Sequence, residues 1–387
     1  MDMTDIAQHY HRTYGGEPEV VAHAPGRVNI IGEHVDYNDG LVLPFAVSQR
    51  IVVAAGRDDS GFVTVHSAPL DADARFAVGV ATPTDPPAWE NYVRGMVHGL
   101  RAEGVHLRGA RLWIGGDLAP GSGMSSSAAL CVSVGMAMAR LGGVDVSRER
   151  LARIAQAAEH EFAGTPCGMM DQMAACFGRA GHALLLDCRD LSHEDVPCQP
   201  DGAQFLVIPS GVKHALADGA YERRVRACRK AVAEIAQTHP EVTALRDVSV
   251  DMLEAHRVRL DEESFKRARH VVTELARVAD AVEALKDGDW WGIGRLLWQT
   301  QDSLRNDYEV SCGEIDELID LLRRQDGVLG ARMVGGGFGG IVLAIVQEAR
   351  LEQVQKTIQS CYHTPHGLCE RAFTVAPSAG AAVSDRP

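Results

Sequence analysis

Hydrophobic and polar residues along the chain follow two spacings. Period-two alternation and short apolar runs predict strands at residues 20–24, 51–56, 62–66, 110–114, 182–187 and 204–208. Helical spacing of apolar residues predicts helices at residues 4–14, 89–102, 124–141, 148–163, 220–237, 262–285, 290–305 and 314–325. Strands mixed with helices come first, and a mostly helical, charged part follows and closes on a few short strands. This order predicts a two-domain α/β or α+β protein, with domains at 1–200 and 201–387.

Composition and charge exclude several classes of function. The 387 residues are 46% apolar and 23% charged, as in a globular protein that buries a core. The net charge of −14 argues against broad nucleic-acid binding and means that an anionic substrate must be attracted by cations at its own site. The N-terminal residues lack the apolar core of a signal peptide, and the apolar run at 341–346 is too short to cross a membrane.

Cysteine usage bears on the compartment and on metal binding. The nine cysteines include no C-x-x-C pair, which predicts reduced thiols in the cytoplasm rather than disulfides or a zinc site. A metal held by protein ligands alone is therefore not expected, whereas a metal that enters with a substrate remains open.

A glycine- and serine-rich stretch at 121–129, Gly-Ser-Gly-Met-Ser-Ser-Ser-Ala-Ala, lies at the start of a predicted helix. Glycines let the backbone approach a ligand closely, and a helix start presents free N–H groups and the positive end of the helix dipole. These features favour a phosphate-binding loop, although no lysine follows the glycines as in a Walker A loop. A serine-capped helix after an ordinary turn would give the same pattern, so both interpretations stay open here.

A polar loop at 25–37 reads Pro-Gly-Arg-Val-Asn-Ile-Ile-Gly-Glu-His-Val-Asp-Tyr. Glu33, His34 and Asp36 could exchange hydrogen bonds with several hydroxyls of a sugar, and Arg27 could hold a phosphoryl group. A solvated turn is the alternative, because loops are commonly polar.

Two further segments could carry chemistry. Asp171 is the only charged residue between Glu161 and Arg179, and such an isolated carboxylate is either a helix cap or a reactive group. The glycines at 335–340 satisfy G-x-G-x-x-G, but a predicted strand follows them instead of a helix. A tight loop beside a ligand therefore fits them better than a dinucleotide site.

These segments together resemble the motifs of galactokinases, which belong to the GHMP small-molecule kinases. The loop at 25–40 resembles the N-terminal galactokinase signature, and the stretches at 121–129 and 333–340 resemble the second and third GHMP motifs. Further similar stretches are Trp-Glu-Asn-Tyr-Val from Trp89, Ala-Glu-His-Glu-Phe-Ala-Gly-Thr-Pro-Cys-Gly-Met-Met-Asp-Gln from Ala158, Val-Lys-His-Ala-Leu from Val212, Tyr-Glu-Arg-Arg from Tyr221 and Arg-Ala-Arg-His-Val-Val from Arg267. The similarity extends over most of the chain.

The resemblance implies an α+β, two-domain GHMP kinase fold. The N-terminal domain would be mixed α/β (ribosomal S5 domain 2-like), the C-terminal domain would be ferredoxin-like α/β, and the active site would lie in the cleft between them. It also implies ATP-dependent phosphorylation of the C1 hydroxyl of α-D-galactose to galactose 1-phosphate, with Mg²⁺, by a monomeric cytoplasmic enzyme.

The resemblance also implies roles for individual residues. Asp171 would be the base and Arg27 would stabilise the transition state. The sugar would be held by Glu33, His34, Val35, Asp36 and Tyr221. The nucleotide would be held by Ser67, Trp89, Gly121, Ser122, Gly123, Met124, Ser125, Ser126 and Ser127, and Mg²⁺ by Ser127 and Glu159. Phosphoryl transfer depends mainly on positioning and charge neutralisation, which agrees with these roles.

Three positions depart from the common galactokinase pattern. Cys131 stands where many relatives have Glu, Ile341 where Cys is frequent, and Val35 where Thr is frequent. Val35 leaves the preferred sugar open. The alternatives are a related sugar 1-kinase, acting on N-acetylgalactosamine or arabinose, and a non-catalytic galactose sensor. The complete serine stretch, together with Arg27 and Asp171, favours an active kinase.

Overall fold

The computed structural model describes residues 3–79, 82–213, 219–362 and 371–385. Its contacts divide the chain into two compact units. The first unit contains Met1–Arg27, Ala46–Ala180 and Ser378–Pro387, and the second contains Val28–Phe45 and Gly181–Pro377. Each unit is thus assembled from segments that are distant in the sequence. The contiguous division at residue 200 stays a prediction.

A six-stranded sheet in the order β13-β1-β3-β6-β4-β5 forms the framework of the first unit. Its strands are β1 (Val20–Asn29), β3 (Pro44–Arg57), β4 (Phe62–Ser67), β5 (Ala72–Ala77), β6 (Ala110–Gly116) and β13 (Ala382–Asp385). β3 pairs with β6 antiparallel, whereas β4 pairs with β6 in parallel. A parallel pair needs a crossover connection, and the chain makes it through β5 and helix α2.

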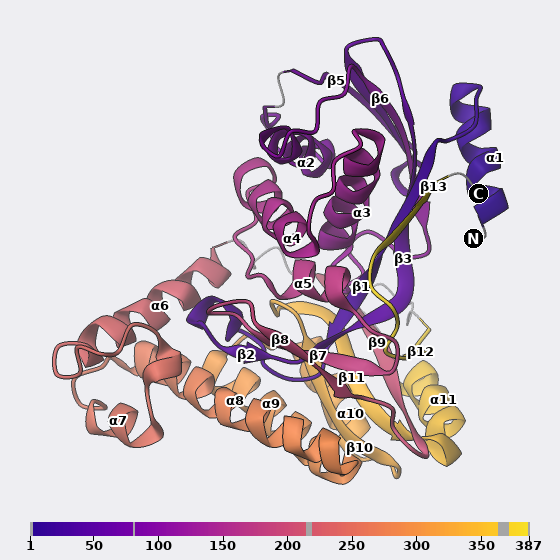
Figure 1. Ribbon diagram of the computed structural model, residues 1–387. Coiled ribbons are helices and arrows are strands. Elements are labelled where there is room, and N and C mark those ends of the chain that lie inside the picture. The colour runs from indigo at the N-terminus through magenta and orange to yellow at the C-terminus, as the bar shows by residue number, and fades with distance from the viewer. Residues whose placement is uncertain (1–2, 80–81, 214–218, 363–370, 386–387) are drawn as a thin grey trace. The chain divides into compact units, whose positions relative to one another are not determined.

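Helices cover the first unit's sheet on both faces (Figure 1). They are α1 (Met3–Tyr14), α2 (Glu90–Ala102), α3 (Ser126–Leu141), α4 (Arg148–Ala157) and α5 (Met170–Phe177). Ile6 and Tyr10 of α1 pack against Val52, Ala54 and Trp113 of the sheet. The helices α2, α3 and α4 contact one another on the opposite face. Their packing supports the two segments that begin α3 and α5, where the serine stretch and Asp171 lie.

The second unit contains a four-stranded sheet in the order β10-β11-β9-β12. Its strands are β9 (Ala203–Lys213), β10 (Val328–Val334), β11 (Gly339–Gln347) and β12 (Phe373–Val375). Numbered along the chain, the strands lie side by side as 4-1-3-2, and helices connect the first to the second and the third to the fourth. This is the ferredoxin-like arrangement that the resemblance implied.

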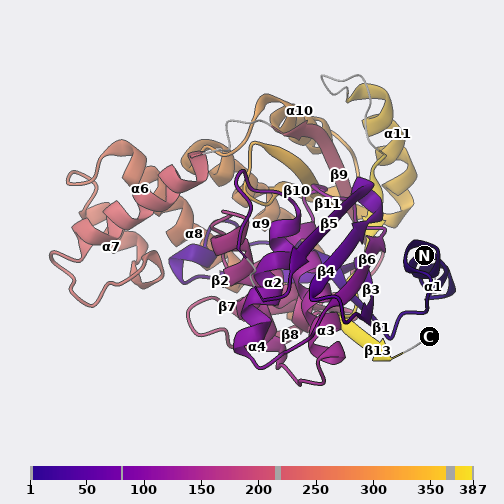
Figure 2. The ribbon, with the colours of Figure 1, turned by 90° about the horizontal axis from the view of Figure 1, so that it is seen from above.

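The helices of the second unit form its larger part. They are α6 (Ala220–Ile235), α7 (Val250–Ala255), α8 (Glu262–Asp287), α9 (Trp290–Ser303), α10 (Gly313–Arg323) and α11 (Leu351–Cys361). Figures 1 and 2 place α6 and α7 together at one end of this unit, where both contact α8. The unit also contains a three-stranded sheet of β2 (Leu41–Val42), β7 (His182–Asp187) and β8 (His193–Pro197). Its strand β2 comes directly after the polar loop along the chain. This sheet anchors the end of that loop, because Leu41 pairs with Asp187.

Most predicted elements are confirmed, with corrected ends. The strand predicted at 20–24 continues to Asn29, so the first five residues of the segment 25–40 are strand and only its later part is irregular. The helix predicted at 148–163 ends at Ala157 and continues as a π-helical turn, Ala158–Phe162. The helix predicted at 290–305 likewise ends at Ser303 and continues as a π-helical turn, Leu304–Tyr308. These two π-helical turns contain Glu159 and Tyr308, which are described below.

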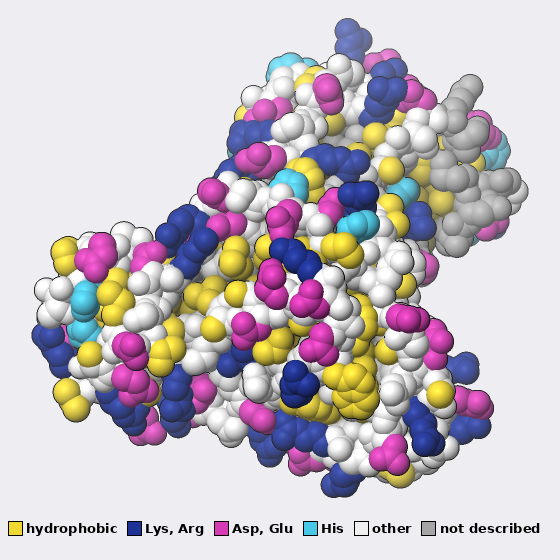
Figure 3. Space-filling view, turned by 60° about the horizontal axis from the view of Figure 1, so that its bottom comes forward, with side chains coloured by type: hydrophobic (Ala, Val, Ile, Leu, Met, Phe, Trp, Pro, Cys, Tyr) yellow, Lys and Arg dark blue, Asp and Glu magenta, His cyan; other side chains and the backbone are white. Residues whose placement is uncertain are grey.

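The surface of the described chain is mixed in charge. Figure 3 shows Lys and Arg side chains interspersed with Asp and Glu over the face that it presents. Large hydrophobic side chains exposed among the described residues are Leu70, Val250, Val258 and Trp291. In the part of the chain that the structure describes, no helix has both the length and the apolar character needed to cross a membrane.

Candidate functional site

Asp171 and Arg27 form a two-pronged ion pair in the first unit. Arg27 donates from Nε to Oδ1 of Asp171 at 2.7 Å and from Nη2 to Oδ2 at 2.9 Å. The guanidinium side chain is 7% exposed and the carboxylate side chain 21%. Asp171 lies in the first turn of α5, but the residue before that helix, Met169, makes no side-chain cap. The carboxylate therefore faces Arg27 and is not used as a helix cap.

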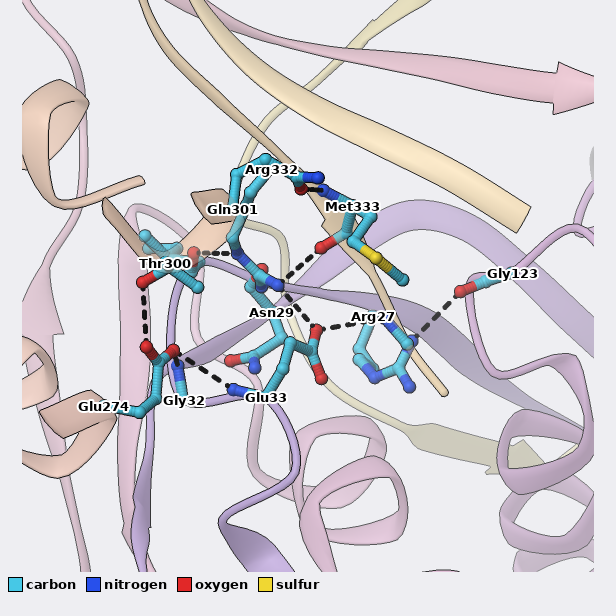
Figure 4. Close-up of polar contacts among 12 residues, drawn as sticks. Arg27, Asn29, Gly32, Glu33, Gly123, Glu274, Thr300, Gln301, Arg332 and Met333 are labelled. Carbon is cyan, nitrogen blue, oxygen red and sulfur yellow. Dashed lines mark hydrogen bonds and ion pairs between the residues drawn. The ribbon is translucent and has the colours of Figure 1, made fainter. Parts of the chain in front are cut away.

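The serine stretch lies beside this pair. Ser125 donates a hydrogen bond from Oγ to Oδ2 of Asp171, and it precedes α3 with φ of 57° and no side-chain cap. Arg27 donates from Nη1 to the main-chain oxygen of Gly123 at 3.2 Å, as Figure 4 shows, and from its main-chain N–H to that of Met124 at 3.1 Å. The interpretation as an ordinary serine cap is therefore wrong for Ser125, because its hydroxyl is directed to Asp171.

Gly26 permits the close approach of β1 to this stretch. A Cβ atom at Gly26 would lie 2.6 Å from the main-chain oxygen of Met124. Real Cβ atoms do not approach a backbone oxygen so closely, so the strand and the loop could not keep this spacing with any other residue. The Pro-Gly-Arg sequence thus brings Arg27 against the serine stretch.

Glu159 provides a buried carboxylate in the same unit. It lies in the π-helical turn after α4, is 3% exposed, and accepts hydrogen bonds from Ser127 and from Nε2 of Gln172, the latter at 2.7 Å. Burial, and then the negative charge of Asp171, raise the pKa of Glu159 to about 7. A cation beside this carboxylate would remove that penalty.

The donor set at Ser127 and Glu159 fits a hard divalent cation. Both side chains offer oxygen, which Mg²⁺ prefers, and few protein ligands are needed when phosphate oxygens and water complete the shell. Among the residues that the structure describes, no group of three or more His, Cys, Asp and Glu side chains could hold a metal by itself.

A cavity of about 190 Å³ opens next to the start of α3. Of the residues assigned to the nucleotide, it is lined by Ser67, Trp89, Gly121, Ser126 and Ser127. The remaining lining residues are Ile51, Pro69, Leu70, Tyr92, Ile114, Pro120 and Leu130. The lining is mostly apolar and aromatic, with glycine and serine contributed by the stretch 121–127. Such a pocket suits a flat heterocycle joined to an anionic tail.

Ser122, Gly123, Met124 and Ser125 do not line this cavity. Gly123, Met124 and Ser125 instead contact Arg27 or Asp171, as described above. Ser122 has a buried hydroxyl with no hydrogen-bond partner in the described structure. The serine stretch therefore divides into a part facing the cavity and a part facing the ion pair.

Glu33 of the polar loop lies in the second unit and is held by two donors. Its Oε1 accepts from Nη1 of Arg332 at 3.0 Å and from the main-chain N–H of Gly335 at 3.0 Å. Arg332 is fully buried and also donates to the main-chain oxygens of Ile30 and Met333, both at 2.7 Å, and to that of Asn29. Figure 4 shows the guanidinium between Glu33 and Met333. The third glycine motif is thus tied directly to the polar loop.

A second buried acid supports the same loop. Oε1 of Glu274, on α8, accepts from the main-chain N–H of Gly32 at 2.8 Å, and its Oε2 accepts from Thr300 at 2.9 Å (Figure 4). Oε2 also accepts from Arg277 at 2.8 Å. Burial acts to raise the pKa of Glu274, but the charges of Arg277, His270 and Arg332 together with the hydrogen bond from Gly32 lower it, so the carboxylate stays ionised. Neither Glu274 nor Arg332 was predicted from the sequence, because each lies far from the loop along the chain.

The rest of the loop forms an aromatic cluster. The ring of His34 lies 6.0 Å from that of Tyr221 and 4.6 Å from that of Tyr308, between ring centres. Asp36 is half-buried at the start of the 3-10 turn Asp36–Asn38. Val35 is fully buried, and its main-chain oxygen accepts from the N–H groups of Asn38 and Gly40. The structure thus brings His34 and Tyr221 together and uses Val35 to shape the loop.

Two other motif positions can now be placed. Cys131 is buried in α3, where burial and then the charge of Glu159 raise its pKa. A neutral thiol therefore stands near Glu159. Of Val-Lys-His-Ala-Leu, the residues 214–216 lie outside the described residues.

Comparisons with known proteins show the family. The galactose-binding signature of galactokinases matches residues 8–57, and the N-terminal and C-terminal domains of GHMP kinases match residues 91–179 and 281–364. The chain is 40% identical over 380 residues to a galactokinase of Roseiflexus, covering 98% of this chain and 97% of that protein. It is 41% identical over 381 residues to a galactokinase of Streptomyces coelicolor, covering 97% of each.

Solved structures give the same result. The crystal structure of Lactococcus lactis galactokinase complexed with galactose superposes with a TM-score of 0.92 at 31% identity, covering 98% of this chain and 99% of that one. Methanococcus jannaschii mevalonate kinase, at a TM-score of 0.66 and 14% identity over 92% of this chain and 98% of that one, shares the fold. The predicted α+β GHMP kinase fold is confirmed, and the chain belongs to the galactokinase family.

Proposed function

We propose that this chain transfers the γ-phosphoryl group of ATP to the C1 hydroxyl of α-D-galactose and forms galactose 1-phosphate and ADP. The ion pair of Asp171 with Arg27, with the serine stretch hydrogen-bonded to both, is the observation that carries the proposal. A carboxylate, a cation and a phosphate-binding loop are the groups that this transfer needs, and all three meet within the first unit.

The bonding changes follow from these groups. The oxygen on C1 of the sugar forms a bond to the γ-phosphorus, and the bond from that phosphorus to the bridging oxygen of ADP breaks. The hydroxyl proton passes to Asp171 as the oxygen attacks. Asp171 is a much weaker base than an alkoxide, so it takes the proton late, as the loose transition state forms. Arg27 neutralises charge on the transferring group, and its second prong keeps Asp171 oriented.

The two ligands are held by different residues. Ser67 and Trp89 contact the base of ATP, and the stretch 121–127 contacts its phosphates through main-chain N–H groups at the start of α3. Ser127 and Glu159 would hold Mg²⁺, which would neutralise phosphate charge. Glu33, His34, Asp36 and Tyr221 exchange hydrogen bonds with the hydroxyls of galactose. Of these, Glu33 is fixed in place by Arg332 and Gly335.

The proposal also covers the state of the protein in the cell. We take the protein to be a cytoplasmic enzyme and a monomer. Light scattering after gel filtration would test the monomer, which predicts a mass near the 41.7 kDa of one chain.

An ADP-release assay with a panel of sugars tests the proposal. We expect ADP formation that depends on Mg²⁺ and on galactose, with much lower kcat/KM for N-acetylgalactosamine, arabinose and glucose. A preference for one of the other sugars would replace galactose as the substrate. Galactose binding without ADP formation would instead make the chain a sensor.

A further inference from the structure

The donors that hold Glu33 meet only one of its two carboxylate oxygens. Nη1 of Arg332 and the main-chain N–H of Gly335 both donate to Oε1, each at 3.0 Å. No group in the part of the chain that the structure describes donates to Oε2. Nε2 of His34 is fully enclosed without a partner, but Oε2 of Glu33 is not enclosed. Although Glu33 is only 3% exposed, its Oε2 is therefore free to accept a hydrogen bond from a ligand.

Arg332 has little freedom to turn away from Glu33. Its fully buried guanidinium also donates from Nε to the main-chain oxygen of Ile30 at 2.7 Å and from Nη2 to that of Asn29. Nη1 donates in addition to the main-chain oxygen of Met333 at 2.7 Å. These three oxygens are neutral, so Glu33 supplies the negative charge that a buried guanidinium requires. Because the planar guanidinium is fixed at three other oxygens, it also fixes the position of Oε1.

Helix α9 supports both sides of this contact. Oε1 of Gln301 accepts from the main-chain N–H of Met333 at 2.8 Å, directly after Arg332 in β10. The preceding residue, Thr300, donates to Glu274, whose other carboxylate oxygen holds the polar loop as described above. Thr300, Gln301 and Glu274 are all buried. The polar loop and the strand that carries Arg332 are thus anchored to two successive residues of one helix.

Gly335 supplies the second donor because of its backbone conformation. Its φ of 91° lies in the left-handed region that favours glycine. A Cβ atom at this position would meet nothing within 4 Å beyond its chain neighbours. Conformation, and not crowding, therefore requires glycine here, and this conformation directs the N–H toward Glu33.

We propose that Arg332 and the N–H of Gly335 position Glu33 so that its Oε2 accepts a hydrogen bond from one sugar hydroxyl other than that at C1. Arg332 is then a positioning residue for sugar recognition, and the first glycine of the third motif serves the same purpose. This inference rests on the proposed function for the identity of the ligand. A sugar without a hydroxyl at this point would leave the carboxylate oxygen unpaired and be selected against.

Glu33→Gln reverses the hydrogen bonding at the free oxygen alone. Arg332 and Gly335 offer only donors to this side chain, so the amide oxygen of glutamine must take the place of Oε1. Its NH₂ group then takes the place of Oε2. The variant keeps both hydrogen bonds to the protein but presents the sugar with a donor instead of an acceptor. Urea unfolding checks that the variant is folded.

Calorimetric binding in the absence of ATP tests the proposal with galactose and its 2-, 3-, 4- and 6-deoxy analogues. We expect Glu33→Gln to bind galactose about tenfold to a hundredfold more weakly than the wild type does, the effect of one hydrogen bond to a charged group. One analogue, which lacks the hydroxyl that meets Oε2, should bind equally to both proteins. The other analogues should be weakened by the same factor as galactose.

The outcomes of this comparison are distinct. Equal weakening of every analogue, or no weakening of galactose, would overturn the inference while leaving the proposed function intact. If the wild type binds no galactose, the proposed function fails and the inference fails with it.

Arg332→Lys tests the positioning role. Lysine keeps the positive charge but lacks the planar fork, so Oε1 is no longer held in one place. We expect the KM for galactose to rise about tenfold and the KM for ATP to stay unchanged. The analogue singled out by Glu33→Gln should escape this rise, whereas a merely structural effect would change both KM values and affect all sugars alike.

Gly335→Ala is a second variant, used if Arg332→Lys does not fold. It keeps Arg332 and disturbs only the second donor, since alanine is strained at this φ. We expect a several-fold rise in the KM for galactose alone. An unchanged KM for galactose in whichever of the two variants is folded would refute the positioning role.

Glu309→Gln is the matched control. Oε2 of Glu309 accepts from Nη2 of Arg267 at 2.8 Å, and Arg267 is only 4% exposed. The same substitution is thus made at a carboxylate that a buried arginine holds in the same unit, outside every motif. We expect galactose binding to be unchanged. A loss as large as that in Glu33→Gln would refute a specific role for Glu33 and Arg332.

Discussion

Replacing Asp171 with Asn separates its role as a base from its role in the structure. The carboxylate accepts two hydrogen bonds from Arg27 and one from Ser125. An amide has the same shape, but one of its two positions becomes an N–H donor. At least one N–H donor of Arg27 therefore loses its acceptor, and the guanidinium no longer faces a negative charge.

Asp171→Asn is expected to lower both the free energy of unfolding and kcat, by amounts that can be worked out. A hydrogen bond to a charged group contributes about 1.5–3 kcal/mol, so we expect the free energy of unfolding to fall by about 2–3 kcal/mol. Arg27 retains its bond to Gly123, which limits the loss. Loss of general-base assistance lowers kcat by about 10²–10⁴. The catalytic loss should therefore exceed anything explained by partial unfolding at 25 °C.

The assay combines kcat from ADP release with calorimetric binding of galactose and of Mg-ATP. We expect binding of both ligands to be nearly retained. Asp58→Asn is a matched control, because Asp58 holds Arg111 through its carboxylate at 3.0 Å in the same unit but lies outside every motif. A kcat for Asp171→Asn within a few-fold of wild type would refute its role as the base. If the binding of galactose and Mg-ATP is lost together with kcat, the role of Asp171 is structural.

Three further outcomes follow from the structure. Asp36→Ala should raise the KM for galactose far more than that for ATP, and the reverse pattern would move Asp36 out of the sugar site. Ser127→Ala should raise the Mg²⁺ concentration needed for half-maximal rate, because a ligand of the metal is lost, and an unchanged requirement would count against it. Burial lowers the pKa of His270 to about 4, below its usual 6.5, so the folded protein binds fewer protons than the unfolded chain between these values and is less stable as pH falls. Between pH 7 and pH 5, the free energy of unfolding measured by urea titration should therefore fall by about 2 kcal/mol more in the wild type than in His270→Gln. An equal fall in both proteins would contradict this.

The sequence predicted residues within a motif better than their partners outside it. Arg27, Asp171 and the serine stretch each stand out by residue type, and the structure shows them in contact. That Ser125 bonds to Asp171 instead of capping α3 could not be predicted, because a serine before a helix fits either role. The deciding factor is the close approach of β1, which depends on Gly26.

The partners of the polar loop were missed for a different reason. Arg332 lies 299 positions from Glu33 along the chain, and Tyr308 lies 271 positions from Tyr37. Each looks ordinary in its own segment: Arg332 lies within a strand, and Tyr308 lies just beyond the helix predicted at 290–305. Only folding brings them to the loop. The local signal that could have drawn attention to Arg332 is an arginine within a run of otherwise apolar residues.

The position of the transferred phosphoryl group tests the central claim most directly. Wild-type protein is incubated with Mg-ATP and galactose, and the product is examined by ³¹P NMR with proton coupling. The account predicts a phosphorus signal coupled to the anomeric proton of an α-galactosyl product, formed in equal amount to ADP. A phosphorus coupled to the protons on C6, or galactose left unchanged while the protein is folded, would contradict it.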